Sequence, residues 1–194
     1  MENPFFQNKG PKKIEDILTQ IEPQNKSEYQ GINISDIKDL VNASNKDITF
    51  FHSKKYELAA SKTKAAFCIT TKNLSSKLPD NCRPIEVDNV LVSTAVITAM
   101  FYPDAITDEF DVHILNIEKT PYNNSVNHGQ NILIGKNVKI GSNCSIGHNT
   151  IIESNVVIGD NCSIGSNVII RNTLIKNNVS ILDGSVIGKK GFGF

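Results

Sequence analysis

The stretch NILIGKNVKIGSNCSIGHNTIIESNVVIGDNCSIGSNVII, residues 131–170, decides the fold. Isoleucine stands at every sixth position in it, and the same column continues beyond it after the loss of one residue. The members of the column are Ile134, Ile140, Ile146, Ile152, Ile158, Ile164, Ile170, Ile175, Ile181 and Ile187. An amphipathic helix would place its apolar residues at spacings of three and four instead. The strict period of six therefore indicates a repeat architecture in which each unit adds one short strand.

Two more columns accompany the isoleucines. Small or β-branched residues stand two positions earlier, at Ile132, Val138, Cys144, Thr150, Val156, Cys162, Val168, Thr173, Val179 and Ser185. Asparagines stand three positions earlier, at Asn131, Asn137, Asn143, Asn149, Asn155, Asn161, Asn167, Asn172 and Asn178, and Gly184 takes the last place.

The three columns together predict the shape of one coil. Residues i and i+2 share one face of a strand, so the two apolar columns point into one narrow interior. Asn and Gly tolerate a positive φ, so their column marks the corners. Three strands and three corners make a coil of 18 residues. We predict a left-handed parallel β-helix over residues 131–194, incomplete at its C-terminus, with an irregular corner at 171–174.

The residues before the repeat read as a separate mixed α/β domain, residues 1–105. Apolar residues at helical spacing predict helices at 12–21, 34–43 and 93–102. The β-rich runs DITFF, AAFCITT and PIEVDNVLVS predict strands between them. Residues 106–130 are expected to form an extended connection to the first coil.

Composition excludes several classes of protein. Lys plus Arg and Asp plus Glu number 20 each, so no net charge attracts nucleic acid or an anionic membrane. No run approaches the ~18 apolar residues of a membrane span, and the N-terminus lacks the apolar core of a secretory signal. We expect a cytoplasmic protein. The four cysteines form no CxxC pair and have no His at metal-ligand spacing, so we expect buried thiols and no metal site.

Three segments together resemble a known family, the UDP-3-O-acylglucosamine N-acyltransferases of lipid A biosynthesis in Gram-negative bacteria. The segments are SDIKDLVNASNKDITFFHSKKY at 35–56, the hexapeptide repeat, and VIGKKGFGF at 186–194, which is similar to the family's VVGxDGFGF/Y loop. The repeat alone says little about function, because many acyltransferases share it. The combination is more specific.

The resemblance implies a site for the uracil of a UDP-sugar. The family motif ITFxxNxKY places the base between two aromatic rings, and the matching residues here are Phe50 and Tyr56. Each stacked ring contributes about 1–3 kcal/mol. The base-reading Asn of the motif is replaced by Ser53, which has one rotatable donor. Lys54 or Lys55 is a candidate partner of the diphosphate, the alternative being a solvated face. For Phe50 the alternative is core packing.

The resemblance also implies the reaction. A 3-hydroxyacyl chain passes from the phosphopantetheine thioester of acyl carrier protein to the 2-amine of the sugar, with no bound cofactor. The general base is a His in a later IDNxxQIAHN-like motif, so we expect it beyond Phe194 and expect this chain to be an inactive N-terminal fragment. The loop Gly191, Phe192, Gly193 and Phe194 is expected beside the active site or, alternatively, packed on the neighbouring coil.

The histidines within the chain are not assigned to catalysis. His148 stands two residues after an inward isoleucine, so we interpret it as a solvent-facing corner residue. His52, His113 and His128 have no acidic partner at a recognisable spacing, and no chemistry is assigned to them.

The family assembles as a homotrimer with active sites between subunits, and we expect the same here. Two other functions stay open. One is an acetyl-CoA-dependent acetyltransferase of a sugar or small molecule, and the other is a non-catalytic trimeric scaffold. The residues downstream of Phe194 would separate them.

Overall fold

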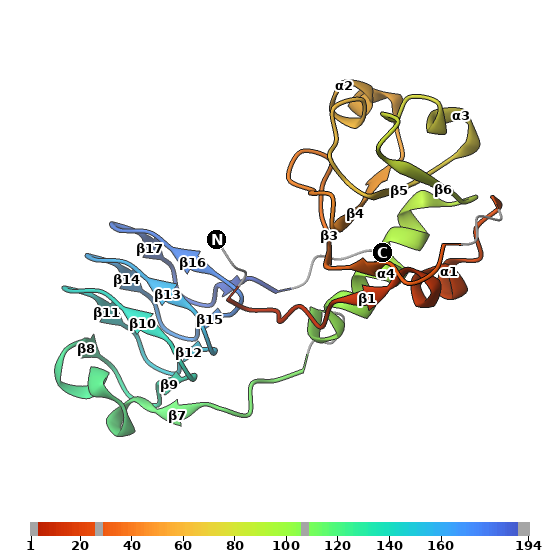
Figure 1. Cartoon of the computed structure of the whole chain (residues 1–194). Coiled ribbons are helices and arrows are strands. Elements are labelled where there is room, and N and C mark those ends of the chain that lie inside the picture. The colour runs from red at the N-terminus through yellow and green to blue at the C-terminus, as the bar shows by residue number, and fades with distance from the viewer. Residues whose placement is uncertain (1–3, 26–28, 106–108, 190–194) are drawn as a thin grey trace. The chain divides into compact units, whose positions relative to one another are not determined.

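The computed structural model describes residues 4–25, 29–105 and 109–189. The chain divides into two compact units, Phe6–Thr107 and Asp108–Phe194, the latter together with Met1–Phe5. Figure 1 shows both units with their elements labelled.

The N-terminal unit is built on a parallel sheet of order β3-β4-β5-β6. Its strands are β3 (Asp36–Ile37), β4 (Asp47–Phe51), β5 (Phe67–Thr70) and β6 (Arg83–Glu86). A separate antiparallel pair joins β1 (Lys12–Lys13) to β2 (Asn33–Ile34). The helices are α1 (Ile14–Ile21), α2 (Glu57–Ala60), α3 (Lys72–Ser75) and α4 (Val90–Phe101), with 3₁₀ turns η1 (Lys54–Tyr56) and η2 (Pro103–Ala105).

Helices cover both faces of this sheet. On one face Ile48, Ile69 and Ile85 form a buried cluster with residues of α1 and α4, such as Ile17 and Ile97. On the other face a second cluster lies beneath α2 and α3, and it contains Phe51, Cys68, Ala60 and Leu74. Neighbouring strand residues therefore face opposite cores, as the two-residue period of a strand requires.

The predicted helix at 34–43 is wrong. Ile34 and Ile37 belong to β2 and β3, and Val41 is 79% exposed. The Asp39 carboxylate accepts hydrogen bonds from the backbone N–H groups of Val41 and Asn42, at 2.9 and 3.0 Å. An Asp side chain that binds its own downstream backbone favours a turn over a helix. The helical spacing of the isoleucines was therefore coincidental.

The other predicted elements are present with shifted ends. Residues 47–51 form β4 as predicted, and the first helix begins at Ile14 because Lys12 and Lys13 pair with β2. The run PIEVDNVLVS divides between β6 and α4. The Asn89 side chain caps α4 by accepting from the backbone N–H of Val92 at 3.1 Å, so the helix begins at Val90.

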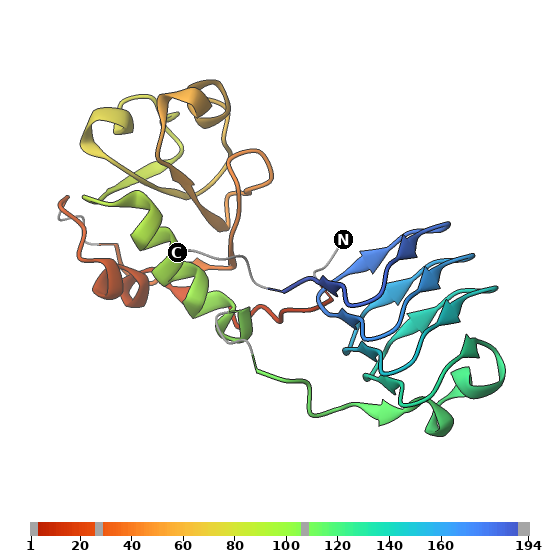
Figure 2. The same cartoon turned by 180° about the vertical axis from the view of Figure 1, so that it is seen from behind.

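The C-terminal unit is a parallel β-helix of two-residue strands (Figure 2). Its strands are β8 (Asn127–His128), β9 (Leu133–Ile134), β10 (Lys139–Ile140), β11 (Ser145–Ile146), β12 (Ile151–Ile152), β13 (Val157–Ile158), β14 (Ser163–Ile164), β15 (Ile169–Ile170), β16 (Leu174–Ile175), β17 (Ser180–Ile181) and β18 (Val186–Ile187). Strand β7 (Leu115–Asn116) pairs antiparallel with β9, and the turns η3 (Ile117–Lys119) and η4 (Pro121–Asn124) precede β8.

The columns read from the sequence occupy the predicted places. Seven members of the isoleucine column are buried, and Ile140, Ile181 and Ile187 are partly buried against the same core. The corner asparagines adopt φ values between 50° and 65°, and Gly184 has a φ of 73°. Cys144 and Cys162 are adjacent, because Ser145 pairs with Ser163 in the ladder. The predicted fold class is confirmed.

Two details of the β-helix differ from the simple repeat. Strand β8 pairs with β11, so the first coil begins at Asn127 within the expected connection of 106–130. Val126 and His128 stand in the small and isoleucine columns there, and the polar His hid the pattern. At the irregular corner one residue is missing between Ile170 and Leu174, so the pairing register changes from 18 residues to 17.

Candidate functional site

The residues of the predicted uracil site lie at the carboxyl end of β4 and in the turn after it. Ligands of open parallel sheets bind outside the carboxyl ends of the strands. Phe50 lies on β4 and is half-buried against the core that α1 and α4 cover. Tyr56 closes η1, six residues later, and its side chain is 43% exposed. Both rings are thus held by short regular elements.

His52 lies between these two rings. Its ring is stacked on Phe50 with centroids 6.4 Å apart and an interplanar angle of 24°, and its centroid lies 5.4 Å from that of Tyr56. Such spacings are those of interacting aromatic pairs, about 4.5–7 Å. Sequence reasoning missed His52, although Phe50 and His52 at i and i+2 are expected on the same side of an extended chain. The three rings form one cluster beside the end of β4.

Ser53 begins the turn that carries Tyr56. Its side-chain oxygen accepts from the backbone N–H of Lys55 at 3.4 Å, which makes it the N-cap of η1. The Lys55 ammonium lies 6.0 Å from the centroid of the Tyr56 ring, and Lys54 is exposed beside it. The cluster therefore combines aromatic faces, a hydroxyl and two cationic side chains. This combination suits a planar base that carries an anionic group.

A polar network fixes the start of the same strand. Asp47 is 1% exposed, and its carboxylate accepts from the backbone N–H and the hydroxyl of Ser44 and from Lys38, at 2.9, 2.7 and 3.0 Å. Burial alone would raise the pKa of Asp47, but these hydrogen bonds outweigh it and hold the pKa below its ordinary value. The Tyr102 hydroxyl donates to Asp36 at 2.7 Å, and burial, together with that carboxylate, raises the pKa of Tyr102 to about 12.

The described residues include no group of three or more His, Cys, Asp or Glu side chains suited to a metal ion. All four cysteines are free and buried. In the described ranges, no helix has the length and apolar character to span a membrane.

His148 is part of the corner structure of the β-helix. Its Nδ1 accepts from the backbone N–H of Gln130 at 3.0 Å, one coil earlier, and its side chain is exposed. His128 contacts the carbonyl of Gly129 and the side chain of Asn123, at 2.7 and 3.3 Å. The predicted loop of Gly191, Phe192, Gly193 and Phe194 lies outside the described residues.

Comparison with known proteins agrees with this division into two units. Residues 32–100 match the family model of UDP-3-O-(3-hydroxymyristoyl) glucosamine N-acyltransferase. The resemblance to this family is therefore confirmed for residues 32–100. The matched segment contains the whole parallel sheet and the aromatic cluster of Phe50, His52 and Tyr56. The bacterial transferase hexapeptide family (six repeats) matches residues 125–159 and 137–172. The first of these matches includes β8, which begins at Asn127.

Curated relatives carry the same family name. The UDP-3-O-acylglucosamine N-acyltransferase of Rickettsia prowazekii is 37% identical over 101 residues, which are 50% of this chain and 29% of that protein. The proteins of that name from Rickettsia felis and Rickettsia canadensis are 35% and 32% identical over 102 and 100 residues. Their matched regions also cover 50% of this chain and 29% of each relative, so the chain aligns with under a third of each protein's length.

Proposed function

We propose that the N-terminal unit binds a UDP-sugar, with the uracil stacked on Phe50 and Tyr56 and with Ser53 at its polar edge. The observation that carries the proposal is the aromatic cluster at the carboxyl end of β4, inside the segment that matches the acyltransferase family. Lys54 and Lys55 stand beside it as partners for the diphosphate. His52 fills the space next to Phe50 and has to rotate away when the base enters.

Calorimetric titration of the full chain with UDP-GlcNAc tests this proposal. Phe50→Ala and Tyr56→Ala are each expected to weaken binding about tenfold or more, the loss of one stacked ring. Leu58→Ala is the matched control, because Leu58 is 72% exposed on α2 and belongs to no ring pair. Unchanged affinity in both aromatic variants would remove the nucleotide assignment.

For the whole protein we propose N-acyl transfer. A 3-hydroxyacyl chain would pass from acyl carrier protein to the 2-amine of UDP-3-O-acylglucosamine in the cytoplasm, as a step of lipid A biosynthesis. The family match and the names of the relatives support this reaction class. The transfer needs a general base for the amine. His148 already accepts a backbone hydrogen bond through Nδ1, so we propose that the base lies outside the described residues.

An assay of the 194-residue chain with acylated carrier protein tests this part separately. We expect UDP-sugar binding without turnover. Turnover that disappears in His148→Asn would identify His148 as the base and overturn its structural assignment. Transfer from acetyl-CoA in place of the carrier protein would instead favour the acetyltransferase alternative.

We further propose a homotrimer assembled through one wall of the β-helix. Strands β9, β12, β15 and β18 share a sheet whose outward residues are Leu133, Ile151, Ile169 and Val186. A continuous aliphatic stripe on an outer face is typical of a surface that another subunit covers.

A further inference from the structure

The segment before the first coil, residues 111–115, crosses the β-helix as a strap and is fixed to it at both ends. At its far end, β7 pairs with β9, and the backbone N–H of Ile117 donates to the carbonyl of Ile132 at 2.9 Å. At its near end, the Asp111 carboxylate accepts from the backbone N–H of Ser154 at 2.7 Å. The same carboxylate accepts from the backbone N–H of His113 at 2.8 Å, which shapes the turn between them.

The Asp111 contact takes the place of the residue that the repeat has lost. At the other corners the backbone N–H of one coil donates to a side chain of the next, as from Ser142 to Asp160 at 2.7 Å and from Asp160 to Asn177 at 2.9 Å. The deletion after Ile170 removes the residue that would accept from Ser154 in this way. Asp111 of the strap accepts from the Ser154 N–H instead, so the strap completes the hydrogen bonding of this corner.

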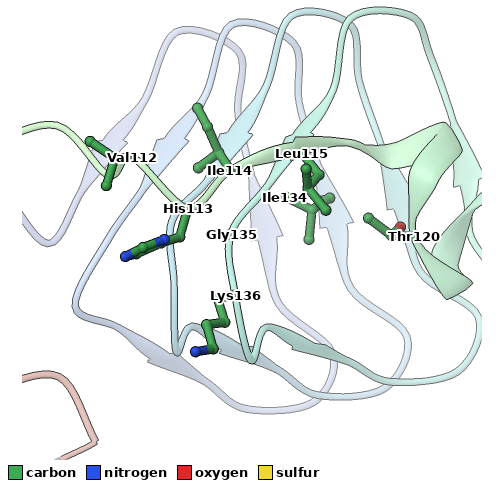
Figure 3. Close-up of a pocket in the computed structure, with 8 residues that line it drawn as sticks. All are labelled: Val112, His113, Ile114, Leu115, Thr120, Ile134, Gly135 and Lys136. Atoms are coloured by element: carbon green, nitrogen blue, oxygen red, sulfur yellow. The ribbon is translucent and has the colours of Figure 1, made fainter.

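Between these two attachments the strap leaves an open pocket of about 400 Å³ against the first coil. Val112, Ile114 and Leu115 of the strap and Ile134 of β9 give it an apolar lining. His113 and Lys136 are its nitrogen-bearing side chains, and Figure 3 shows both pointing to the left, away from Leu115 and Ile134. Leu115 and Ile134 thus lie on one side of the two basic side chains, and Val112 lies on the other side, beyond His113.

Hydrogen bonds connect the backbone positions that carry the two basic side chains. The backbone N–H of Lys136 donates to the Ser154 hydroxyl at 2.8 Å, and the backbone N–H of Ser154 donates to Asp111. His113 follows Asp111 in the turn that the same carboxylate closes. Ser154 and Asp111 therefore link the backbones of Lys136 and His113 by hydrogen bonds, although 23 positions separate the two in the sequence.

We propose that this pocket binds an aliphatic carboxylate, with the carboxylate between His113 and Lys136 and the chain along Leu115 and Ile134. A carboxylate has two acceptor oxygens, which matches two donor side chains on separate residues. A volume of about 400 Å³ lies in the range of small-molecule sites, and decanoate is a suitable probe of medium chain length. The proposal does not rest on the nucleotide site, which lies in the other unit.

Methyl NMR of the full chain, with Ile, Leu and Val methyl groups labelled, tests the proposal by titration with decanoate below its micelle concentration. We expect saturable shifts at Val112, Ile114, Leu115 and Ile134. Lys136→Gln and His113→Gln are each expected to weaken the affinity about three- to tenfold, the range of a partly exposed charged contact. The matched control is Lys139→Gln, because Lys139 is an exposed lysine on β10 outside the pocket.

Three outcomes would overturn the proposal. Decanoate shifts confined to Ile151, Ile169 and Val186 would mean nonspecific adsorption to the outer stripe. Equal affinities in the Lys136, His113 and Lys139 variants would remove the basic end from the site. Tighter saturable binding of decyl phosphate, or of the cation decyltrimethylammonium, would contradict the carboxylate assignment. UDP-GlcNAc binding is measured in the same samples, so loss of the nucleotide site is seen separately.

Discussion

Ser53 caps η1 after the end of β4. The same position is Asn in the family motif. The Ser53 hydroxyl accepts from the backbone N–H of Lys55, and a lone hydroxyl reads fewer positions on a base than a carboxamide does. Asn is as good an N-cap as Ser, so an Asn here keeps the turn and adds one donor.

Ser53→Asn is accordingly expected to tighten binding of UDP-GlcNAc about two- to tenfold, the worth of one neutral hydrogen bond. Ser53→Ala, which loses the cap and adds nothing, is the matched comparison and is expected to bind no tighter than the parent chain. Calorimetry on the three proteins decides the matter. If Asn and Ala weaken binding alike, position 53 does not face the base.

Asp47 makes the stability of the N-terminal unit depend on pH in the acid range. Its folded pKa lies below the ordinary value because hydrogen bonds from Ser44 and Lys38 outweigh the effect of burial. A lowered pKa stabilises the fold above the unfolded-state pKa of about 3.9, and this stabilisation is lost as the pH falls through the folded pKa. Asp47→Asn is expected to cost about 1.5–3 kcal/mol at pH 7, the range for a hydrogen bond to a charged group.

Hydrogen exchange of the β4 amides checks this prediction. The difference between Asp47→Asn and the parent chain should be large at neutral pH and should shrink below the folded pKa. Asp80→Asn changes an exposed carboxylate and should show no difference at either pH. A constant difference at all pH values would mean that the ionised state of Asp47 is not what stabilises β4.

The aromatic cluster shows how far sequence reasoning reaches at the scale of single residues. Phe50 and Tyr56 were marked through a family motif, and their roles stay predictions. His52 has no acidic partner at a recognisable spacing in the sequence, and its neighbours in the structure are aromatic rings. The contact with Tyr56 depends on the 3₁₀ turn between them, which the run HSKKY does not reveal. Spacing finds residues on one face of an element and misses contacts made across a turn.

Among the elements, the corners of the β-helix repeat one hydrogen-bonding device. Gln130 donates to His148, His148 to Ser166, and Ser166 to Asp183, at 3.0, 3.1 and 2.6 Å. Each step joins a backbone N–H to a side chain of the next coil. The corner residue therefore needs an acceptor and not a particular side chain, since His, Ser, Asp and Asn all serve.

His148→Ala is expected to lower the stability of the β-helix by about 0.5–1.5 kcal/mol, because the N–H of Gln130 loses its protein acceptor. His148→Asn keeps an acceptor, as Asn177 does at a neighbouring corner, and should lose much less. Thermal unfolding and the exchange rate of the Gln130 amide measure both variants. Equal losses would show that His148 stabilises the corner through its ring.

The elements of the β-helix were predictable because one constraint acts on every residue of a coil. Most inward positions are apolar and each corner has a positive φ, so the sequence repeats over most of the β-helix. Residues 34–43 carry no such repetition. Their apolar spacing fits a helix as well as a turn, and the side chain of Asp39 decides between the two. The first coil escaped prediction for a similar reason, since His128 breaks the apolar column at its start.

At the scale of the whole molecule, two outer walls of the β-helix differ in chemistry. One carries the aliphatic stripe of Leu133, Ile151, Ile169 and Val186, and the next carries Ser145, Ser163 and Ser180 at the equivalent positions. Inward isoleucines line both walls, so the interior does not require the difference. An interface with another subunit would explain why one wall is aliphatic. In a closed ring of three copies, the aliphatic stripe of each copy can contact a different face of the next copy.

Ile151→Asp and Ile169→Asp are therefore expected to convert a trimer of the chain into monomers. Burying each aliphatic side chain contributes about 1.5–3 kcal/mol, and a carboxylate buried in its place without a partner would add a further cost in every subunit. Ser163→Asp places the same charge on the serine wall and should leave the trimer intact. Sedimentation equilibrium of the full chain measures all three variants against the parent. A monomeric parent chain, or a Ser163→Asp variant that dissociates like the others, would contradict assembly through the aliphatic wall.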